Sequence, residues 1–496
     1  MKFYNRKSEL EELHLIENLS NESAQLAVVV GRRRVGKTTL LRHAFTQIPV
    51  LYFFIGKKNE ILLCEEFTTE VSEKLNENLG HFEKFSELFR TLMEISQRKN
   101  FTLIIDEFQE FLNINPSVFS DMQHIWDSHK ENSKMNLAIC GSIYSLMKRI
   151  FENAKEPLYG RATSRMLIKP FRIHTIKEIL SDYNPSYSPE DLLAFYMITG
   201  GVAKYIEQLV IRKAFTKQAI FKTIFREGSY FLEEGKSVLV DEFGKDYGNY
   251  FSVLSLIANS KTERGAIEST LNMPVGGFLD KLEKEYNLIK KVRPYMAKEG
   301  SRSNRYRIED NFLNFWFRFI YKYRSAVEIG NMEYLYKVVE RDYDTYSGII
   351  LEKYFRQLFA ESNEYSDIQG YWDNKGENEI DLIAVNDMEK RIVIGEVKRN
   401  AKRISLPLLE RKAENIIKKH SSYQIEFRGF SLEDMKFNAH LLPITKFKAQ
   451  LFPNAFFLGI FPWIGNGKPY QPDGMMFIIH LLQQLFSQRQ NHIKSN

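Results

Sequence analysis

The stretch Leu26-Ala-Val-Val-Val-Gly-Arg-Arg-Arg-Val-Gly-Lys-Thr38 decides the fold. Its apolar run at 26–30 predicts a buried strand, residues 31–38 match the phosphate-binding pattern GxxxxGK(S/T), and residues 38–46 favour a helix. Glycines in such a loop let backbone N–H groups face phosphate oxygens, and the following helix adds the positive end of its dipole. A chance glycine-rich turn is the alternative, but strand, loop and helix all agree. The pattern therefore predicts binding of a nucleoside triphosphate.

Residues of this loop receive individual roles. Lys37 is expected to reach the β- and γ-phosphates and to act in catalysis, and the Thr38 hydroxyl is expected to hold Mg²⁺. The residues assigned to nucleotide binding are Gly31, Arg32, Arg33, Arg34, Val35, Gly36, Lys37, Thr38 and Thr39.

Composition places the chain among globular proteins. With 496 residues it is too long for one core, and about three or four domains are expected. The net charge of +6 permits a nucleic-acid partner without requiring one. Its two cysteines lie far apart and outside any CxxC motif, which argues against a disulfide framework or a cysteine zinc site. The N-terminus lacks the apolar core of a secretion signal, and no uncharged run reaches membrane-spanning length, so a cytoplasmic protein is expected.

Short apolar strands alternate with helical patterns in the first part of the chain. This alternation predicts an α/β fold with a parallel sheet and helices on both faces. The expected strands are 26–30, 50–55, 101–106 and 136–141. The third ends in Asp106 and Glu107: Asp106 is expected to hold Mg²⁺ through water, and Glu107 to polarise the attacking water. The alternative is a strand that runs into acidic, solvent-facing residues.

Two further positions are candidates for catalysis. Ser142 follows the fourth strand and is expected to orient the water or to sense the γ-phosphate, with a plain turn as the equal alternative. Arg161 and Arg165 follow, and an arginine that reaches the γ-phosphate is worth about three to five orders of magnitude in rate. Arg161 is preferred, serving either its own site or that of a neighbouring copy in a homo-oligomer. The alternative is a solvated surface arginine.

Together these motifs resemble the archaeal-type ATPases of the AAA+/STAND-related P-loop group. The motifs follow the order of that family: residues 3–10, 31–38, 103–109, 140–142, 158–161 and 199–205. The resemblance implies ATP and Mg²⁺ as cofactors, ATP hydrolysis as the activity, and an opening box including Arg6 that lies beside the adenine. It also implies a helical lid, in which Ala203 stands where proline is more usual, so that the nucleotide-sensing role of Lys204 stays open.

Residues 251–310 have the layout of a winged helix: three helical patterns at 251–259, 263–271 and 274–286, then two strands. The strands and the wing carry positive charge that suits a DNA phosphate backbone, with domain packing as the equal alternative. The basic residues are Lys290, Lys291, Arg293, Lys298, Arg302, Arg305 and Arg307. The aromatic stripe that follows from Phe312 is expected to be core.

A second chemical signal lies near the C-terminus. Asp381 on one strand of an expected hairpin, and Glu396 and Lys398 two residues apart on the other, are expected to share a face. Two carboxylates on Mg²⁺ beside a lysine suit phosphodiester hydrolysis, and with Glu352 on a preceding helix the set resembles the PD-(D/E)xK nuclease fold. A hairpin with ordinary cross-strand ion pairs, or a nuclease fold that no longer cuts, are the alternatives.

The expected organisation has five parts: a P-loop ATPase core (1–170), a helical lid (171–245), a winged helix (246–325), a nuclease-like α/β domain (326–440) and a basic, aromatic tail (441–496). Two functions remain open. One is an ATPase that drives a nuclease-like domain on double-stranded DNA. The other is a nucleotide-dependent switch that binds protein or DNA and cuts nothing.

Overall fold

The computed structural model describes residues 1–244, 247–298, 300, 303–373, 378–437 and 447–448. The expectations for Arg302 and for most of the tail 441–496 lie outside these residues. Every described helix is too short or too polar to cross a membrane.

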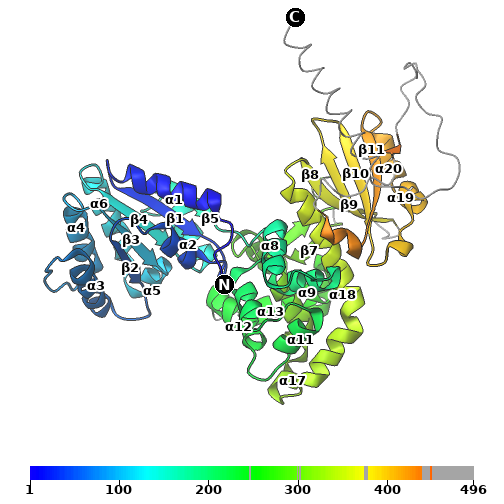
Figure 1. The fold of residues 1–496 in the computed structure, drawn as a ribbon, viewed down its shortest axis with the longest axis horizontal. Helices are drawn as coiled ribbons and strands as arrows, with labels where there is room; N and C mark the ends of the chain where they lie inside the picture. The colour runs from blue at the N-terminus through cyan, green and yellow to red at the C-terminus, as the bar shows by residue number, and fades with distance from the viewer. Residues whose placement is uncertain (245–246, 299, 301–302, 374–377, 438–446, 449–496) are drawn as a thin grey trace, which may run out of the picture. The chain divides into compact units, whose positions relative to one another are not determined.

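A five-stranded parallel sheet forms the centre of the first domain (Figure 1). Its strands lie in the order β2-β3-β4-β1-β5, and each neighbouring pair is parallel. Their bounds are β1 (Gln25–Val30), β2 (Val50–Phe54), β3 (Phe101–Asp106), β4 (Met135–Cys140) and β5 (Ser164–Leu167). The predicted α/β class is confirmed, and the first four strands fall within one residue of their predicted ends.

Helices cover both faces of this sheet because successive strand residues point in opposite directions. Ala27 and Val29 pack with α1 and α2, whereas Leu26 and Val28 pack with the helices of the other face. The helix bounds are α1 (Lys7–Leu19), α2 (Lys37–Ala44), α3 (Glu60–Leu75), α4 (Phe85–Ile95), η1 (Phe108–Glu110), α5 (Phe111–Ile114), α6 (Ser117–His129) and α7 (Tyr144–Glu152).

A group of helices follows the sheet as the lid. Its second helix begins with a capping box, in which Ser188 and Asp191 exchange side-chain and backbone hydrogen bonds, and with Pro189 at the first helical position. The bounds are α8 (Ile173–Tyr183), α9 (Pro189–Thr199), α10 (Ala203–Ile211), α11 (Lys217–Ile224) and α12 (Tyr230–Phe243).

The next elements have the predicted winged-helix order of three helices and an antiparallel strand pair. The third helix begins at Gly276, two residues after the proline that was expected to open it. The bounds are α13 (Tyr247–Ala258), α14 (Arg264–Leu271), α15 (Gly276–Lys284), β6 (Ile289–Val292) and β7 (Arg305–Ile308).

An aromatic connector leads from the winged helix into the C-terminal domain. Phe312, Phe315 and Phe319 are buried, as predicted for a core face. The connector contains α16 (Asn311–Phe315), the π-helix η3 (Trp316–Ile320), η4 (Tyr321–Tyr323) and α17 (Arg324–Glu328). The long helix α18 (Met332–Glu361) follows.

A mixed sheet in the order β12-β11-β10-β9-β8 forms the C-terminal domain (Figure 1). The predicted hairpin is present as the antiparallel pair β9 and β10, whereas β10 and β11 are parallel and are joined by α19 and α20. The bounds are β8 (Asp367–Trp372), β9 (Glu379–Asn386), β10 (Arg391–Val397), η5 (Ala401–Arg403), α19 (Leu406–Lys412), α20 (Glu414–Lys419), β11 (Gln424–Phe430), η6 (Leu432–Lys436) and β12 (Phe447–Lys448).

Hydrophobic packing does not follow the sequence-based divisions after residue 170. One continuous cluster of buried residues includes side chains from the lid, the winged helix, the aromatic connector, α18 and one face of the C-terminal sheet. The other face of that sheet packs against α19 and α20 in a cluster of its own. The ATPase sheet has two separate clusters, one for each face.

Candidate functional site

The loop between β1 and α2 has a backbone shape that its glycines permit. Gly36 has a φ of 96°, in the region that side chains disfavour, and a Cβ on Gly31 would lie 2.6 Å from the carbonyl oxygen of Ile168. Lys37 begins α2, and its buried ammonium donates to the carbonyls of Gly31 at 2.8 Å and Arg32 at 3.1 Å. Burial lowers the pKa of Lys37. The charged oxygens of a triphosphate are stronger acceptors than these carbonyls.

Asp106 lies opposite Thr38, as the assignment of both to one Mg²⁺ requires. The Thr38 hydroxyl donates to Asp106 Oδ2 at 2.7 Å, and the Tyr52 hydroxyl donates to the same oxygen at 2.6 Å. The Cys140 thiol donates to Oδ1 at 3.0 Å. Burial alone would raise the pKa of Asp106, but the hydrogen bonds from Cys140, Tyr52 and Thr38 outweigh it and keep the pKa below its usual value. A carboxylate held ionised beside a hydroxyl fits the oxygen ligands that Mg²⁺ prefers.

Glu107 lies directly after β3 with a left-handed backbone, φ 57°. Its Oε2 accepts hydrogen bonds from the Ser142 hydroxyl at 2.7 Å, the Ser142 N–H at 3.2 Å and the Gln109 side-chain amide at 2.6 Å. The structure therefore brings Ser142 and Glu107 together, although they are 35 residues apart in sequence.

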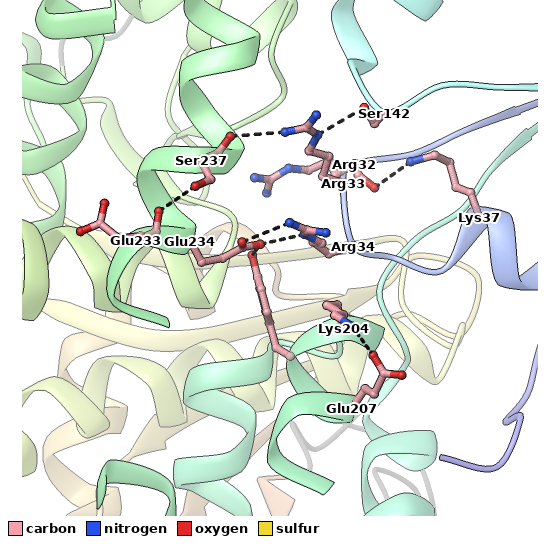
Figure 2. Close-up of polar contacts among 11 residues, drawn as sticks. Arg32, Arg33, Arg34, Lys37, Ser142, Lys204, Glu207, Glu233, Glu234 and Ser237 are labelled. Carbon is pink, nitrogen blue, oxygen red and sulfur yellow. Dashed lines mark hydrogen bonds and ion pairs between the residues drawn. The ribbon is translucent and has the colours of Figure 1, made fainter. Parts of the chain in front are cut away.

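Two of the loop arginines contact the lid helix α12, as Figure 2 shows. Arg34 forms a two-pronged contact with Glu234, whose side chain is only 2% exposed, at 3.0 and 3.4 Å. Arg33 donates to the main-chain carbonyl of Ser237 at 3.3 Å and to the Ser142 hydroxyl at 3.3 Å.

The third loop arginine contacts the end of the winged helix. Arg32 forms an ion pair with Asp310 at 3.0 Å, and Asp310 also caps α16 by accepting the N–H of Leu313. The sequence assigned all three arginines to the nucleotide, but their side chains contact protein groups here. Their assignment to nucleotide binding stays a prediction. The main-chain amides of the loop, which would serve it, do not depend on these side-chain contacts.

Arg6 supports the loop instead of offering a free side chain to a base. Its guanidinium donates to the carbonyls of Val35 at 3.3 Å and Lys169 at 2.8 Å, pairs with Glu9 at 3.0 Å, and lies 4.7 Å from the centre of the Phe171 ring. These contacts tie Arg6 to the main chain of the loop, and its place beside the adenine stays a prediction.

The lid motif at 199–205 lies against the loop. The N–H of Lys204 donates to the Arg34 carbonyl at 3.1 Å, and Ala203 lies beside Gly36. The Lys204 ammonium pairs with Glu207 at 2.6 Å (Figure 2). Lys204 therefore reaches the loop through its main chain.

Arg161 lies at the opposite edge of the sheet. It pairs with Asp127 at 2.9 Å, and the N–H of Thr163 bonds the second residue of β1. The six-residue strand β1 separates this position from the loop by roughly 20 Å at about 3.3 Å per residue. Arg165 is also directed elsewhere, to the carbonyl of Phe151. Neither arginine serves the loop of its own chain in this conformation.

In the C-terminal domain, Lys398 joins the two predicted carboxylates. Its ammonium lies 3.2 Å from Asp381 and 3.5 Å from Glu396, and Asp381 also accepts the N–H of Val397 at 2.8 Å. Burial would lower the pKa of Lys398, but Asp381 and then Glu396 outweigh it and raise the pKa. The three residues therefore converge at the ends of β9 and β10.

Glu352 on α18 belongs to the same cluster. Burial, with the charge of Asp381, raises the pKa of Glu352 to about 6 despite its ion pair with Arg356 at 3.5 Å. Arg356 in turn donates to the main-chain carbonyl of Asp381 at 2.7 Å. Across the described residues, no group of three or more His, Cys, Asp or Glu side chains is arranged to hold a metal ion. Asp381 and Glu396 are residue types that bind Mg²⁺, but the described residues do not provide a third acidic or other metal-binding side chain arranged with them to hold an ion.

Part of the basic wing is used against the C-terminal domain. Arg305 pairs with Glu379 at 2.8 Å and lies 4.5 Å from the Trp372 ring. Burial, and then the charge of Arg356, lowers the pKa of Arg307 to about 10. For these two arginines, the contacts are those expected if the wing packs against another domain. The exposed basic residues that remain for another partner are Lys290, Lys291, Arg293 and Lys298.

Comparison with known families identifies two segments. A family described as an ATPase domain predominantly from Archaea matches residues 3–209. A second family, described as archaeal and bacterial proteins of unknown function, matches residues 316–416. The chain is therefore similar to two separate sequence families, one over the ATPase domain and one over the C-terminal domain, and the predicted resemblance to the archaeal ATPase family is confirmed.

The chain is similar to individual proteins as well. An uncharacterised protein of Methanocaldococcus jannaschii is 29% identical over 413 residues, which are 80% of this chain and 87% of that protein. Among solved structures, the Walker-type ATPase of Pyrococcus abyssi is 19% identical, with a TM-score of 0.49 over 64% of this chain and 96% of its own. The ORC2 protein of Aeropyrum pernix is 11% identical, with a TM-score of 0.43 over 68% of this chain and 96% of its own.

Sequence reasoning missed four contacting residues of the ATP site. Tyr52 holds Asp106, Gln109 holds Glu107, and Glu234 and Asp310 hold loop arginines. Gln109 lies within the motif at 103–109, which resembles the ATPase family, but the sequence indicated no role for its side chain. Asp310 lies in the segment 305–317, which resembles the family's exit from its winged helix, but that resemblance does not indicate a contact with the loop. Tyr52 and Glu234 belong to no motif.

Proposed function

We propose that the ATPase domain is a Mg²⁺-dependent ATP hydrolase. The observation that carries this proposal is the 2.7 Å contact between Thr38 and Asp106 beside the loop, with Glu107 as the next residue. Thr38 and Asp106 would hold the Mg²⁺, which when bound neutralises charge on the β- and γ-phosphates. Lys37 would leave its loop carbonyls for the phosphates, and Glu107 would orient the attacking water with Ser142 beside it.

The test compares two variants of the full chain. Lys37→Ala is expected to abolish ATP binding, measured by calorimetry, because it removes the ammonium that binds the β- and γ-phosphates. Glu107→Gln is expected to keep binding and to lower phosphate release by at least about a hundredfold, because it removes the water-orienting carboxylate. Normal turnover by both variants would contradict the proposal.

The proposed role of Arg161 as an arginine finger depends on a homo-oligomer. Since its side chain lies far from its own loop, an arginine-finger role requires a neighbouring copy. Sedimentation with and without ATP tests this: a chain that stays monomeric while it hydrolyses ATP would remove the role.

The C-terminal domain is proposed to act on double-stranded DNA as a Mg²⁺-dependent nuclease. Support comes from the convergence of Asp381, Glu396 and Lys398 at one end of β9 and β10, within a β9–β10–α19–α20–β11 order. The two carboxylates would hold the ion, which polarises the phosphate when bound, and Lys398 would balance charge at the phosphate or position the nucleophile. Asp381→Ala is expected to abolish DNA cleavage and to leave ATP hydrolysis intact. Intact ATP turnover without cleavage of any nucleic acid would count against the nuclease.

The second candidate is a nucleotide-dependent switch with an inert C-terminal domain. It is favoured by one observation: Lys398 already bridges Asp381 and Glu396. In this reading ATP and ADP forms differ in affinity for a protein or DNA partner, and Lys37→Ala removes the difference. Equal affinity in both nucleotide states would exclude it.

A further inference from the structure

Arg33 connects two parts of the ATPase that also meet close by, where Glu242 of α12 accepts hydrogen bonds from the Tyr144 N–H and the Ser145 hydroxyl, both at 3.3 Å. The Nε of Arg33 donates to the Ser142 hydroxyl after β4, and its Nη1 donates to the Ser237 carbonyl on α12, both at 3.3 Å (Figure 2). The first partner belongs to the sheet and the second to the lid. A planar guanidinium can satisfy both acceptors at once because its donors diverge in a fixed plane.

The two partners of the Ser142 hydroxyl determine which hydrogen bond it donates and which it accepts. A hydroxyl has one proton to donate and lone pairs to accept with. Arg33 has no acceptor, so Ser142 accepts from it, and the Ser142 proton is then directed to Glu107 at 2.7 Å. A bond from a cation polarises the hydroxyl and strengthens the bond that it donates.

Glu107 is held on one oxygen by this arrangement. Its Oε2 accepts from the hydroxyl and the N–H of Ser142 and from Gln109. These three donors fix the position of Oε2. Since the carboxylate is planar, they also restrict the direction in which Oε1 points. Whatever orients Ser142 therefore orients the group that is proposed to act on water.

We propose that Arg33 is a positioning residue for Glu107, which it orients through Ser142, and that its second hydrogen bond makes this orientation depend on the lid helix α12. The inference rests on the proposed ATP hydrolysis and deepens it by naming the regulation of that site. A displacement of α12 moves the Ser237 carbonyl, shifts the guanidinium, and so alters the donor that holds the Ser142 hydroxyl. Lid position then sets the rate of the water-attack step.

The decisive experiment is a double-mutant cycle on the full chain, with turnover measured by phosphate release at saturating ATP. Arg33→Met is expected to lower kcat by at least about tenfold, because Ser142 loses its orienting donor. In a Ser142→Ala background the same change is expected to have almost no further effect, because the route to Glu107 is already broken. The affinity for ADP, measured by calorimetry, is expected to change less than about twofold, since the loop amides remain.

Two further variants separate the parts of the proposal. Arg34→Met removes a neighbouring arginine that contacts α12 but does not contact Ser142, so its effect on kcat is expected to be additive with Ser142→Ala. Arg33→Lys keeps the charge but has one ammonium in place of a fork, so it is expected to restore only part of kcat. If Arg33→Met does not fold, Arg33→Lys replaces it in the double-mutant cycle with Ser142→Ala.

Several outcomes would overturn the inference. Additive losses for Arg33→Met and Ser142→Ala, or a fall in ADP affinity that parallels kcat, would make Arg33 an ordinary anion-binding residue. Full rescue by Arg33→Lys would remove the dependence on α12. A wild-type chain that does not hydrolyse ATP would instead refute the proposed function, so the two failures are distinguishable.

Discussion

Tyr52 shows how a residue outside every motif can set the chemistry of a motif residue. It lies on β2, one strand away from Asp106, and its hydroxyl is one of the donors that keep the pKa of that carboxyl low. Tyr52→Phe removes this donor and keeps the ring. We expect the pKa of Asp106 to rise, so that the acid limb of the pH–rate profile for ATP hydrolysis moves to higher pH.

Loss of a hydrogen bond to a charged group is also expected to lower stability by about 1 to 3 kcal/mol, which thermal unfolding would register as a lower Tm. Tyr159→Phe is the matched control, because Tyr159 is exposed. An acid limb that stays in place would show that the phenol does not act on Asp106.

Glu352 gives a residue-scale prediction on pH dependence. Its pKa in the folded protein is about 6, above the usual 4.5, so between these values the folded state binds more protons than the unfolded state. Stability therefore falls as pH rises through this window, by on the order of 2 kcal/mol, and the loss is complete above it.

Glu352→Gln is expected to remove this fall, so that the variant gains Tm relative to the wild type above about pH 6. Melting curves from pH 4 to 8 would measure this, with Glu333→Gln, an exposed position on the same helix, as the control. A constant Tm difference across the range would contradict the raised pKa.

At the scale of elements, one buried carboxylate of α12, that of Glu234, forms the ion pair that joins this helix to the loop. Glu234→Gln removes the charge that pairs with Arg34, and it is expected to lower the local opening free energy of α12 by about 1 to 3 kcal/mol, a modest value because Arg34 is itself 37% exposed. Hydrogen–deuterium exchange of residues 230–243 measures this. Glu233→Gln removes the same charge from an exposed neighbour, and equal exchange in both variants would show that the ion pair does not hold the helix.

Elements of the ATPase sheet differ in how far the sequence could predict them. Strands β1 to β4 are apolar runs of five or six residues beside recognisable motifs, so their ends were predicted closely. Strand β5 has only four residues and lies at the sheet edge with two of them exposed, so it has no apolar run to detect.

The contacts within the site also divide into those that the sequence could predict and those that it could not. Ser142 was expected near the attacking water because it follows the fourth strand, and parallel strands bring their carboxyl ends to one edge of a sheet. Glu234 and Asp310 are 200 and 278 residues from the arginines that they bind, and no local pattern records such distances. The contacts of Arg34 with Glu234 and of Arg32 with Asp310 were therefore not predicted from the sequence.

For the whole molecule, Asp310 joins the loop to the segment that leads toward the C-terminal domain. Arg32 binds its carboxylate, the preceding Glu309 offers its carbonyl to Lys353 on α18, and Lys353 adjoins Glu352 of the C-terminal cluster. Asp310→Asn is expected to weaken the ion pair while keeping the cap of α16, since asparagine caps helices as well as aspartate does.

If this contact transmits nucleotide state, the ATP-dependent change in hydrogen–deuterium exchange at residues 378–398 is expected to shrink at least about threefold in the variant. Thermal unfolding in the absence of nucleotide controls for lost stability. An undiminished change would show that the C-terminal domain responds through another route.

The continuous core that begins after the ATPase sheet has a consequence for expression of fragments. A fragment that starts at residue 326 would leave the apolar side of α18, including Tyr346 and Tyr354, without the lid and connector side chains that cover it. We expect such a fragment to aggregate, whereas residues 1–170 keep both of their own clusters and are expected to remain in the supernatant. The natural place to divide this protein is therefore near residue 170, and anyone who isolates the C-terminal carboxylates for assay needs to carry everything downstream of that point.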